Sequence, residues 1–244
     1  NWKAGTSFTN DASSTGIGSI DSAGSFNNDS GFSIVSYTGT GTAGTIKHGL
    51  NSVPRMIIVK RRDGSDSWLV QHGSLGAGKA LNLDSTGAVQ TYDPYWNNTE
   101  PTSSVFSVGN DGRTNGSSET YIAYCFSGVQ GFSKMGSYTG NANANGPFIY
   151  TGFKPAFVMF KNTTGNNWGI IDNKRDSYNG ALHRLLPNTS GADNTGAGVV
   201  IDFLSNGFKC RNADGLENGA AEIIYMAFAE NPFVASNFNA ATAR

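Results

Sequence analysis

Apolar and polar positions alternate along this chain in short stretches, and a polar turn ends most of them. Residues 32–37 alternate small polar with apolar side chains, as a half-buried strand does. Residues 56–59 and 157–160 are continuous apolar runs, and each follows a proline and precedes a lysine, which predicts a central strand buried on both faces. Further strands are predicted at 67–71, 105–108 and 121–126. The best helical candidate, 177–186, is short, so the pattern predicts a β-rich fold.

The same landmarks occur twice along the chain, at offsets of 100 to 102 residues. Such self-similarity indicates a duplicated structural unit. The matched landmarks are Gly31-Phe32-Ser33 with Gly131-Phe132-Ser133, Tyr37-Thr38-Gly39 with Tyr138-Thr139-Gly140, Pro54 and Lys60 with Pro155 and Lys161, Trp68 with Trp168, Phe106 with Phe208, and Phe126 with Phe228.

We therefore expect two repeats, at residues 31–130 and 131–244, after a Gly/Ser/Asn-rich lead-in at residues 1–30. The lead-in is nearly free of large apolar side chains, and Trp2-Lys3-Ala4-Gly5 is a candidate for the last strand of a preceding repeat. Each repeat has many short strands separated by Gly- and Asn-rich turns. This organisation predicts an all-β fold made of two tandem β-sandwich modules of the jelly-roll kind.

The composition of the chain limits the classes of binding partner that we expect. Charged residues make up 14% of the chain and its net charge is −1, so no long-range field attracts nucleic acid or an acidic membrane. No apolar run approaches the roughly 20 residues of a membrane-spanning helix. We expect no nucleic-acid partner and no membrane insertion. Cys125 and Cys210 fall one in each repeat within apolar stretches, which favours two buried free thiols and leaves the redox compartment open.

Residue patterns typical of catalysis or cofactor binding are weak. The three histidines and two cysteines lack the spacing of a zinc site. The five glutamates have no apolar setting that predicts a raised pKa, so a glycosidase pair is not expected. Gly73 to Lys79 has the spacing of a phosphate-binding loop, but Ala80 replaces the Ser or Thr that holds magnesium and no helix is predicted after it. We expect no cofactor, no metal, no catalytic residue and no enzymatic activity.

One loop is a candidate ligand site. Tyr92, Tyr95 and Trp96 cluster beside Asn and Asp in a segment without apolar periodicity, and the second repeat has no counterpart. Flat aromatic rings can stack on sugar C–H faces while amides bind the hydroxyls. The alternative is that these aromatic side chains fold onto their own module or onto a neighbouring subunit.

Three segments of the chain resemble repeats in virion proteins of marine and cyanobacterial bacteriophages, tail fibres and tail adhesins among them. The segments are His48-Gly49-Leu50 with Pro54 and Ile57-Ile58-Val59-Lys60, then Phe203-Leu204-Ser205-Asn206-Gly207-Phe208, then Ile224-Tyr225-Met226-Ala227-Phe228-Ala229-Glu230-Asn231-Pro232-Phe233. The resemblance covers nearly all of residues 31–244. It implies a virion-surface location, on the tail or the head exterior, other virion proteins as partners and a homo-oligomer, with a trimer expected. It carries over no catalytic residue.

The resemblance therefore implies a phage virion structural protein, a tail-fibre or adhesin component that contacts the host surface, with host-surface glycan as an expected partner. Two alternatives remain open. One is a capsid or tail decoration protein that binds only virion proteins, and the other is a carbohydrate-binding module. A polysaccharide hydrolase is the least supported interpretation, because the carboxylates are poorly placed.

Overall fold

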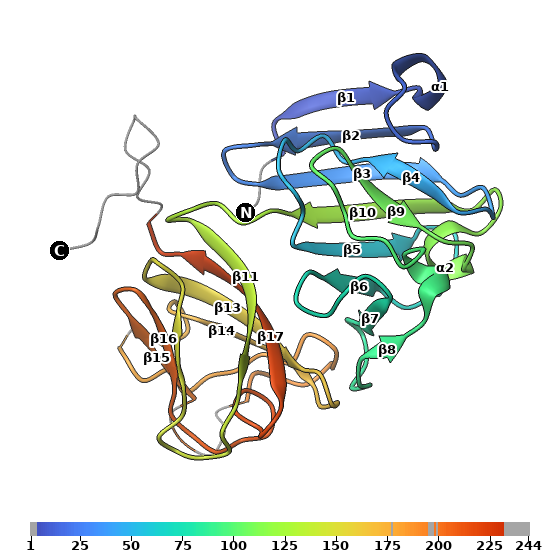
Figure 1. Ribbon diagram of the computed structural model, residues 1–244. Helices are drawn as coiled ribbons and strands as arrows, with labels where there is room; N and C mark the ends of the chain where they lie inside the picture. The colour runs from blue at the N-terminus through green and yellow to red at the C-terminus, as the bar shows by residue number, and fades with distance from the viewer. Residues whose placement is uncertain (1–3, 177, 195–197, 199, 232–244) are drawn as a thin grey trace. The chain divides into compact units, whose positions relative to one another are not determined.

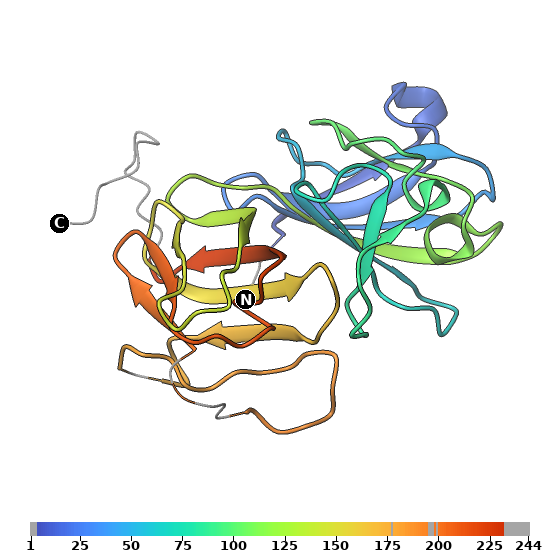
Figure 2. The ribbon, with the colours of Figure 1, turned by 60° about the horizontal axis from the view of Figure 1, so that its bottom comes forward.

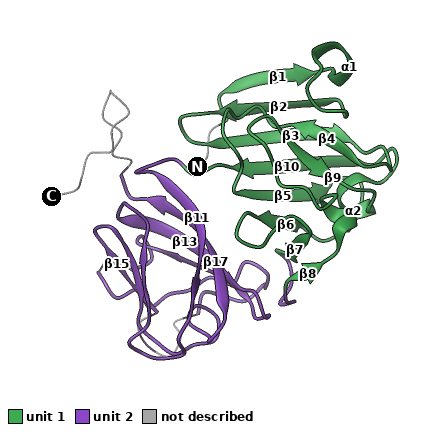
Figure 3. Cartoon of the chain, in the orientation of Figure 1, with its two compact units in different colours: residues 1–83, 89–128 green, residues 84–88, 129–244 purple. Residues whose placement is uncertain are grey.

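The computed structural model describes residues 4–176, 178–194, 198 and 200–231, and the chain divides into two compact units (Figure 3). Unit 1 comprises residues 1–83 and 89–128, and unit 2 comprises residues 84–88 and 129–244. Every pairing between the named strands is antiparallel. The predicted all-β sandwich class is confirmed. Of the helical candidate at 177–186, residue 177 lies outside the described residues and residues 178–186 form no helix.

Unit 1 is built on one long sheet (Figure 1). A smaller two-stranded sheet of β4 (Gly44–Lys47) and β9 (Val105–Val108) completes the unit, with α1 (Ala12–Thr15), the 3-10 turn η1 (Asp93–Tyr95) and α2 (Gly112–Asn115). The strands of the long sheet, in spatial order, are β1 (Thr6–Asn10), β2 (Ser22–Asn27), β3 (Phe32–Thr38), β10 (Thr120–Phe126), β5 (Met56–Arg61), β6 (Leu69–His72), β7 (Lys79–Asn82) and β8 (Gln90–Thr91).

The described part of the expected lead-in belongs to unit 1. β2 pairs with β3 over six residues, and Phe8 and Phe26 pack against the core of the unit. The sequence pattern indicated no core residues in this segment, because two phenylalanines among Gly, Ser and Asn give no periodic signal. Of the candidate strand Trp2 to Gly5, residues 1–3 lie outside the described residues, and Gly5 bonds to Phe26 O within unit 1.

Unit 2 repeats the inner part of this arrangement. Figure 2 shows its larger sheet, with yellow-green β11 followed by red β17 and yellow β13. The strands of that sheet, in spatial order, are β11 (Ser133–Thr139), β17 (Glu222–Ala229), β13 (Pro155–Asn162) and β14 (Trp168–Asp172). The strands of the smaller sheet are β12 (Phe148–Tyr150), β16 (Gly207–Cys210) and β15 (Ile201–Leu204).

The two units therefore share a strand order. The series β3-β10-β5-β6 in unit 1 corresponds to β11-β17-β13-β14 in unit 2, and the pair β4-β9 corresponds to β12-β16. β5 and β13, the strands predicted to be central, each lie between two partners and are largely buried. The duplicated landmarks also occupy like places, since Phe32 contacts Phe126 and Phe132 contacts Phe228, with ring centroids 4.9 and 5.7 Å apart.

A buried asparagine fastens the same turn in both units. The Asn115 side chain donates to Thr42 O and Gly109 O, both at 2.6 Å, and accepts from Thr40 N at 2.8 Å. Asn218 donates to Asn143 O and Asn212 O, both at 2.7 Å, and accepts from Asn141 N at 2.9 Å. The sequence signal is Asp-Gly-x-x-Asn-Gly, which begins at 111 and again at 214 and which the apolar landmarks did not reveal.

Candidate binding surface

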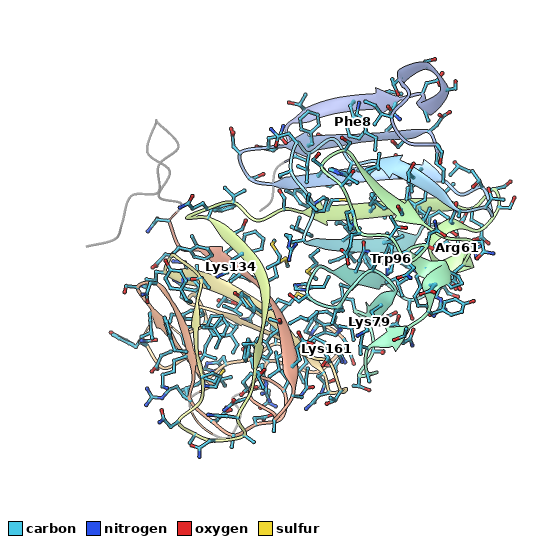
Figure 4. The ribbon with its side chains drawn as sticks, in the orientation of Figure 1. Phe8, Arg61, Lys79, Trp96, Lys134 and Lys161 are labelled. Atoms are coloured by element: carbon cyan, nitrogen blue, oxygen red, sulfur yellow. The ribbon has the colours of Figure 1, made fainter. Side chains whose placement is uncertain are left out.

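The loop predicted as a sugar site is part of the unit 1 core. Trp96 (Figure 4) is 0% exposed and Tyr95 is 3% exposed, whereas Tyr92 is 45% exposed. The Tyr95 hydroxyl donates to Gln90 at 2.9 Å, and the guanidinium of Arg113 lies 4.3 Å from the centre of its ring. A buried ring offers no face to a ligand. The structure therefore corrects the prediction for Tyr95 and Trp96 and favours the alternative, in which the loop folds onto its own module.

A depression of about 380 Å³ lies beside this loop. Its lining includes Pro94, Asn97 and Asn110. No aromatic side chain lines it among the described residues, so the stacking part of a sugar site is missing there. Tyr92 instead packs edge-on against Tyr95, with ring centroids 4.8 Å apart.

An exposed aromatic pair lies instead on β12 in unit 2. Phe148 is 46% exposed and Tyr150 is 58% exposed, while Ile149 between them is 5% exposed and belongs to the core. Side chains alternate between the two faces of a strand, so Phe148 and Tyr150 share the outer face. We define Phe148 and Tyr150 as the aromatic strand of unit 2.

The neighbouring strand, β16, has a glycine beside the two aromatic rings. Gly207 pairs with Tyr150, and Lys209 pairs with Phe148. A side chain at Gly207 would meet the Phe148 ring at 3.0 Å and the Ile149 carbonyl oxygen at 2.1 Å, so only glycine fits beneath the pair. The surface therefore combines two aromatic side chains with a glycine beneath them and a basic residue beside Phe148.

Lys134 of β11 borders this surface (Figure 4). Its ammonium group donates to Tyr150 O at 2.8 Å and lies 5.4 Å from the centre of the Tyr150 ring, within the range of a cation–π interaction. These contacts fix the orientation of Tyr150 and place a positive charge at the rim. Such a surface suits a polar ligand with C–H faces, a sugar above all.

The equivalent strand of unit 1 lacks the aromatic side chains. Ile46 of β4 is buried and pairs with Phe106, as Ile149 pairs with Phe208. The outer positions of β4 are Thr45 and Lys47, where β12 has Phe148 and Tyr150. The shared scaffold therefore does not require aromatic residues at these two positions, so the pair in unit 2 calls for another explanation.

Unit 2 also holds a buried ion pair that no sequence pattern predicted. Arg184 donates to Glu217 at 2.6 Å and lies 3.3 Å from Asp214, and the Glu217 side chain is fully buried. Burial raises the pKa of Glu217 to about 7, although the charge of Arg184 opposes the shift. The expectation that no glutamate sits in a setting that raises its pKa was wrong. Glu217 is nevertheless closed to any substrate, because its carboxylate has no exposed surface.

Histidines and cysteines hold structural positions. His48 is buried and accepts from Leu50 N through Nδ1 at 3.2 Å, which leaves Nε2 to donate to Thr102 O at 3.1 Å. His183 pairs with Asp176 at 2.6 Å. Both cysteines are free and buried, and burial raises the pKa of Cys125 and of Cys210 to about 12.

In the part of the chain that the structure describes, no group of three or more His, Cys, Asp or Glu side chains is placed to hold a metal ion. None of the helices there has the length and apolar character needed to cross a membrane. Lys79, the last residue of the loop compared with a phosphate-binding loop, begins strand β7 and not a helix.

Comparison with known proteins identifies a family that spans both units. Residues 1–232 match a family described as "Domain of unknown function (DUF7483)". No curated protein and no solved structure matches the chain. The matched range includes the residues of the aromatic strand.

Proposed function

This chain belongs to the DUF7483 family of domains of unknown function, and from that premise we propose that it is a non-enzymatic virion-surface module that contacts host-surface glycans. The aromatic strand of unit 2 is the contact surface. Unit 1 presents no equivalent aromatic pair on β4.

One observation carries this proposal. The outer face of β4 in unit 1 carries Thr45 and Lys47. The structurally equivalent positions of β12 in unit 2 carry the exposed Phe148 and Tyr150. Exposed aromatic side chains cost solubility and add little to a fold, so a surface that carries two of them side by side is typical of a binding site. The resemblance to tail-fibre and adhesin repeats supplies the biological setting.

The experiment measures adsorption and glycan binding of the full chain. We expect the double variant Phe148→Ser with Tyr150→Ser to lose at least about tenfold in affinity for host-surface polysaccharide, which corresponds to about 1.4 kcal/mol. The matched control is Tyr92→Ser, which removes a tyrosine of comparable exposure from unit 1. This control should bind like the parent chain.

The outcomes separate the proposal from its rivals. Saturable binding to intact host cells that the double variant loses supports the adhesin. Binding to phage particles and not to cells indicates a decoration protein, and release of reducing ends from the polysaccharide indicates a hydrolase. Either of the last two results overturns the proposal, as does loss of binding in Tyr92→Ser alone.

A further inference from the structure

Strand β6 of unit 1, which lies beside β5 in the long sheet (Figure 1), carries a buried amide. Gln71 is 3% exposed and lies opposite Ile57, a residue of the unit 1 core. Directly opposed residues of antiparallel strands share a face of the sheet, so the Gln71 side chain is on the core face. Neither its Nε2 nor its Oε1 has a hydrogen-bond partner among the described residues. Such a group costs free energy, because it has lost its hydrogen bonds to water.

The duplicated scaffold does not require an amide at this position. In unit 2, Ile171 lies opposite Val158 as Gln71 lies opposite Ile57 in unit 1. Ile171 is 0% exposed and belongs to the core of unit 2. An apolar side chain therefore fills the equivalent place without loss, and the fold alone does not explain why unit 1 buries an amide there.

Two neighbouring positions differ between the units as well. Gly73 N donates to Arg55 O at 2.8 Å in unit 1, and Asn173 N donates to Ala156 O at 3.0 Å in unit 2, so these positions correspond. A side chain at Gly73 would meet the guanidinium carbon of Arg55 at 3.0 Å. Unit 1 thus has a long basic side chain lying over a glycine, whereas unit 2 has alanine and asparagine.

All three of these unit 1 residues line one pocket. Gln71, Arg55 and Gly73 line it together with Glu100, and the rest of its lining is apolar, with Pro54, Met56, Ile57 and Pro101. We define this space as the amide pocket. Its open space is about 150 Å³ and is too narrow for a water molecule, so water does not satisfy Gln71. Arg55 and Glu100 are exposed, and exposed side chains change rotamer within nanoseconds, so these two residues can open the pocket.

The chemistry of the lining specifies the ligand. A partner for Gln71 must offer an acceptor to Nε2 and a donor to Oε1 side by side, which an amide does and a carboxylate does not. The apolar lining favours a methyl group beside that amide. The small volume admits only a fragment of a ligand, because pockets for whole drug-sized molecules enclose about 300 Å³ or more. An acetamido group has one C=O, one N–H and one methyl and meets all three requirements.

We propose that the amide pocket binds the acetamido group of an N-acetylated amino sugar. Gln71 donates through Nε2 to the acetyl carbonyl and accepts the acetamido N–H through Oε1. The sugar ring stays outside, where Arg55 and Glu100 offer a donor and an acceptor to its hydroxyl groups. A primary carboxamide fits less well, because its second N–H would lie unpaired against the apolar lining. The pocket is separate from the aromatic strand, and its argument does not use the contact surface proposed for unit 2.

The side-chain N–H₂ resonances of Gln71 report directly on the pocket. They are identified in the ¹⁵N spectrum of the full chain by their absence from Gln71→Met. We expect N-acetylglucosamine to shift them in a saturable manner and glucosamine, which lacks the acetyl group, to leave them in place. Acetamide, the smallest probe of the same chemistry, should also shift them.

Variants of Gln71 separate binding from folding. Gln71→Ile installs the unit 2 residue and should weaken the binding of N-acetylglucosamine at least about tenfold. It should also raise the midpoint of thermal unfolding by about 2–4 °C, because the unpartnered amide is removed. Gln71→Met, which is unbranched and close to glutamine in length, should lose binding to the same extent without disturbing the packing. The matched control, Gln130→Met, removes an exposed glutamine and should bind like the parent chain.

A further variant keeps this proposal apart from the one for unit 2. The double variant Phe148→Ser with Tyr150→Ser should retain the full response of Gln71 to N-acetylglucosamine, whatever happens to its binding of polysaccharide. Loss of the Gln71 response in that variant would contradict a separate pocket in unit 1.

Four other results would overturn the inference. Gln71 resonances that N-acetylglucosamine leaves unshifted at every concentration would exclude the ligand. An equal response to glucosamine would show that the acetamido group is not recognised. Tighter binding of an N-acetyl-lysine peptide than of the sugar would assign the pocket to a protein partner. A lower unfolding midpoint in Gln71→Ile would show that the amide serves the fold.

Discussion

The two units form the same turn with different side chains as the hydrogen-bond acceptor. His48-Gly49-Leu50 in unit 1 corresponds to Thr151-Gly152-Phe153 in unit 2, and both glycines have positive φ, 81° and 88°. In each unit the first side chain accepts the N–H of the third residue: Nδ1 of His48 from Leu50 at 3.2 Å, and Oγ1 of Thr151 from Phe153 at 3.4 Å. The fold requires an acceptor at this turn and does not require an ionisable one.

At a second pair of equivalent positions, the ionisable residue is in unit 2 and the neutral residue is in unit 1. Thr114 precedes the buried Asn115 in unit 1, and Glu217 precedes the buried Asn218 in unit 2, with their backbone carbonyls accepting from Tyr37 and Tyr138, respectively, both at 2.6 Å. The ionisable group is thus on the histidine turn in unit 1 and on the asparagine turn in unit 2. The comparison teaches that a shared scaffold can carry opposite responses to pH.

The largest effect is expected where the units agree. Asn115→Ala and Asn218→Ala each remove at least three hydrogen bonds of a buried side chain and leave backbone groups without a partner, so each should lower the free energy of unfolding by about 3 kcal/mol or more. Equilibrium denaturation measures the loss. Asn110→Ala and Asn145→Ala, at exposed positions of the two units, are the controls and should change stability by less than about 0.5 kcal/mol. If only one of the two variants lost little stability, the two asparagine turns would not be equivalent.

Glu217 should make unit 2 less stable as the pH rises. Its folded pKa of about 7 exceeds the ordinary value of 4.5, so the native state holds the proton more tightly. The stabilisation is complete below pH 4.5 and is lost as the pH rises through 7, by up to about 3 kcal/mol. Glu217→Gln should remove this dependence in urea unfolding at pH 5 and pH 8, and Glu222→Gln, at an exposed position, should retain it. A pH dependence that survives Glu217→Gln would show that another group is responsible.

His48 should make unit 1 less stable as the pH falls. Burial lowers its pKa from 6.5 to about 4, although the hydrogen bond to the Thr102 carbonyl opposes the shift. Its contribution is complete above pH 6.5 and is lost as the pH falls through 4, by up to about 3 kcal/mol. His48→Thr, which installs the unit 2 residue, should flatten this acid limb in unfolding experiments. An unchanged acid limb would contradict the assignment to His48.

The smallest change in stability is expected at the aromatic strand of unit 2, the surface in which the two units differ. Tyr150→Lys installs the unit 1 residue at a position that is more than half exposed, so unfolding should change by no more than about 0.5 kcal/mol. The same variant should weaken glycan binding by about tenfold or more. Destabilisation of several kcal/mol would instead assign Tyr150 to the fold.

Some of this could be read from the sequence. The repeat and the two buried central strands were predicted, because apolar runs at a fixed offset are local signals. Tyr95 and Trp96 were misplaced because a loop without periodicity does not reveal which way its side chains turn. Phe148 and Tyr150 were missed because a strand of three residues is too short to show alternation.

Glu217 was missed for another reason. Its partner Arg184 is 33 residues away along the chain. Burial of such a pair is a property of tertiary packing, and no local pattern encodes it. The asparagine turns, in contrast, had a readable signal, the repeated Asp-Gly-x-x-Asn-Gly, which a search for polar as well as apolar landmarks would have found.

We propose that duplication left the scaffold in both units and the contact surface in unit 2 alone. Hydrogen–deuterium exchange of the full chain, measured with and without host-surface polysaccharide, distinguishes the two units. We expect the ligand to slow exchange in β12 and its neighbour β16 and to leave β4 and β9 unchanged. Protection of β4, protection of the Tyr92 loop, or no protection in either unit would contradict it.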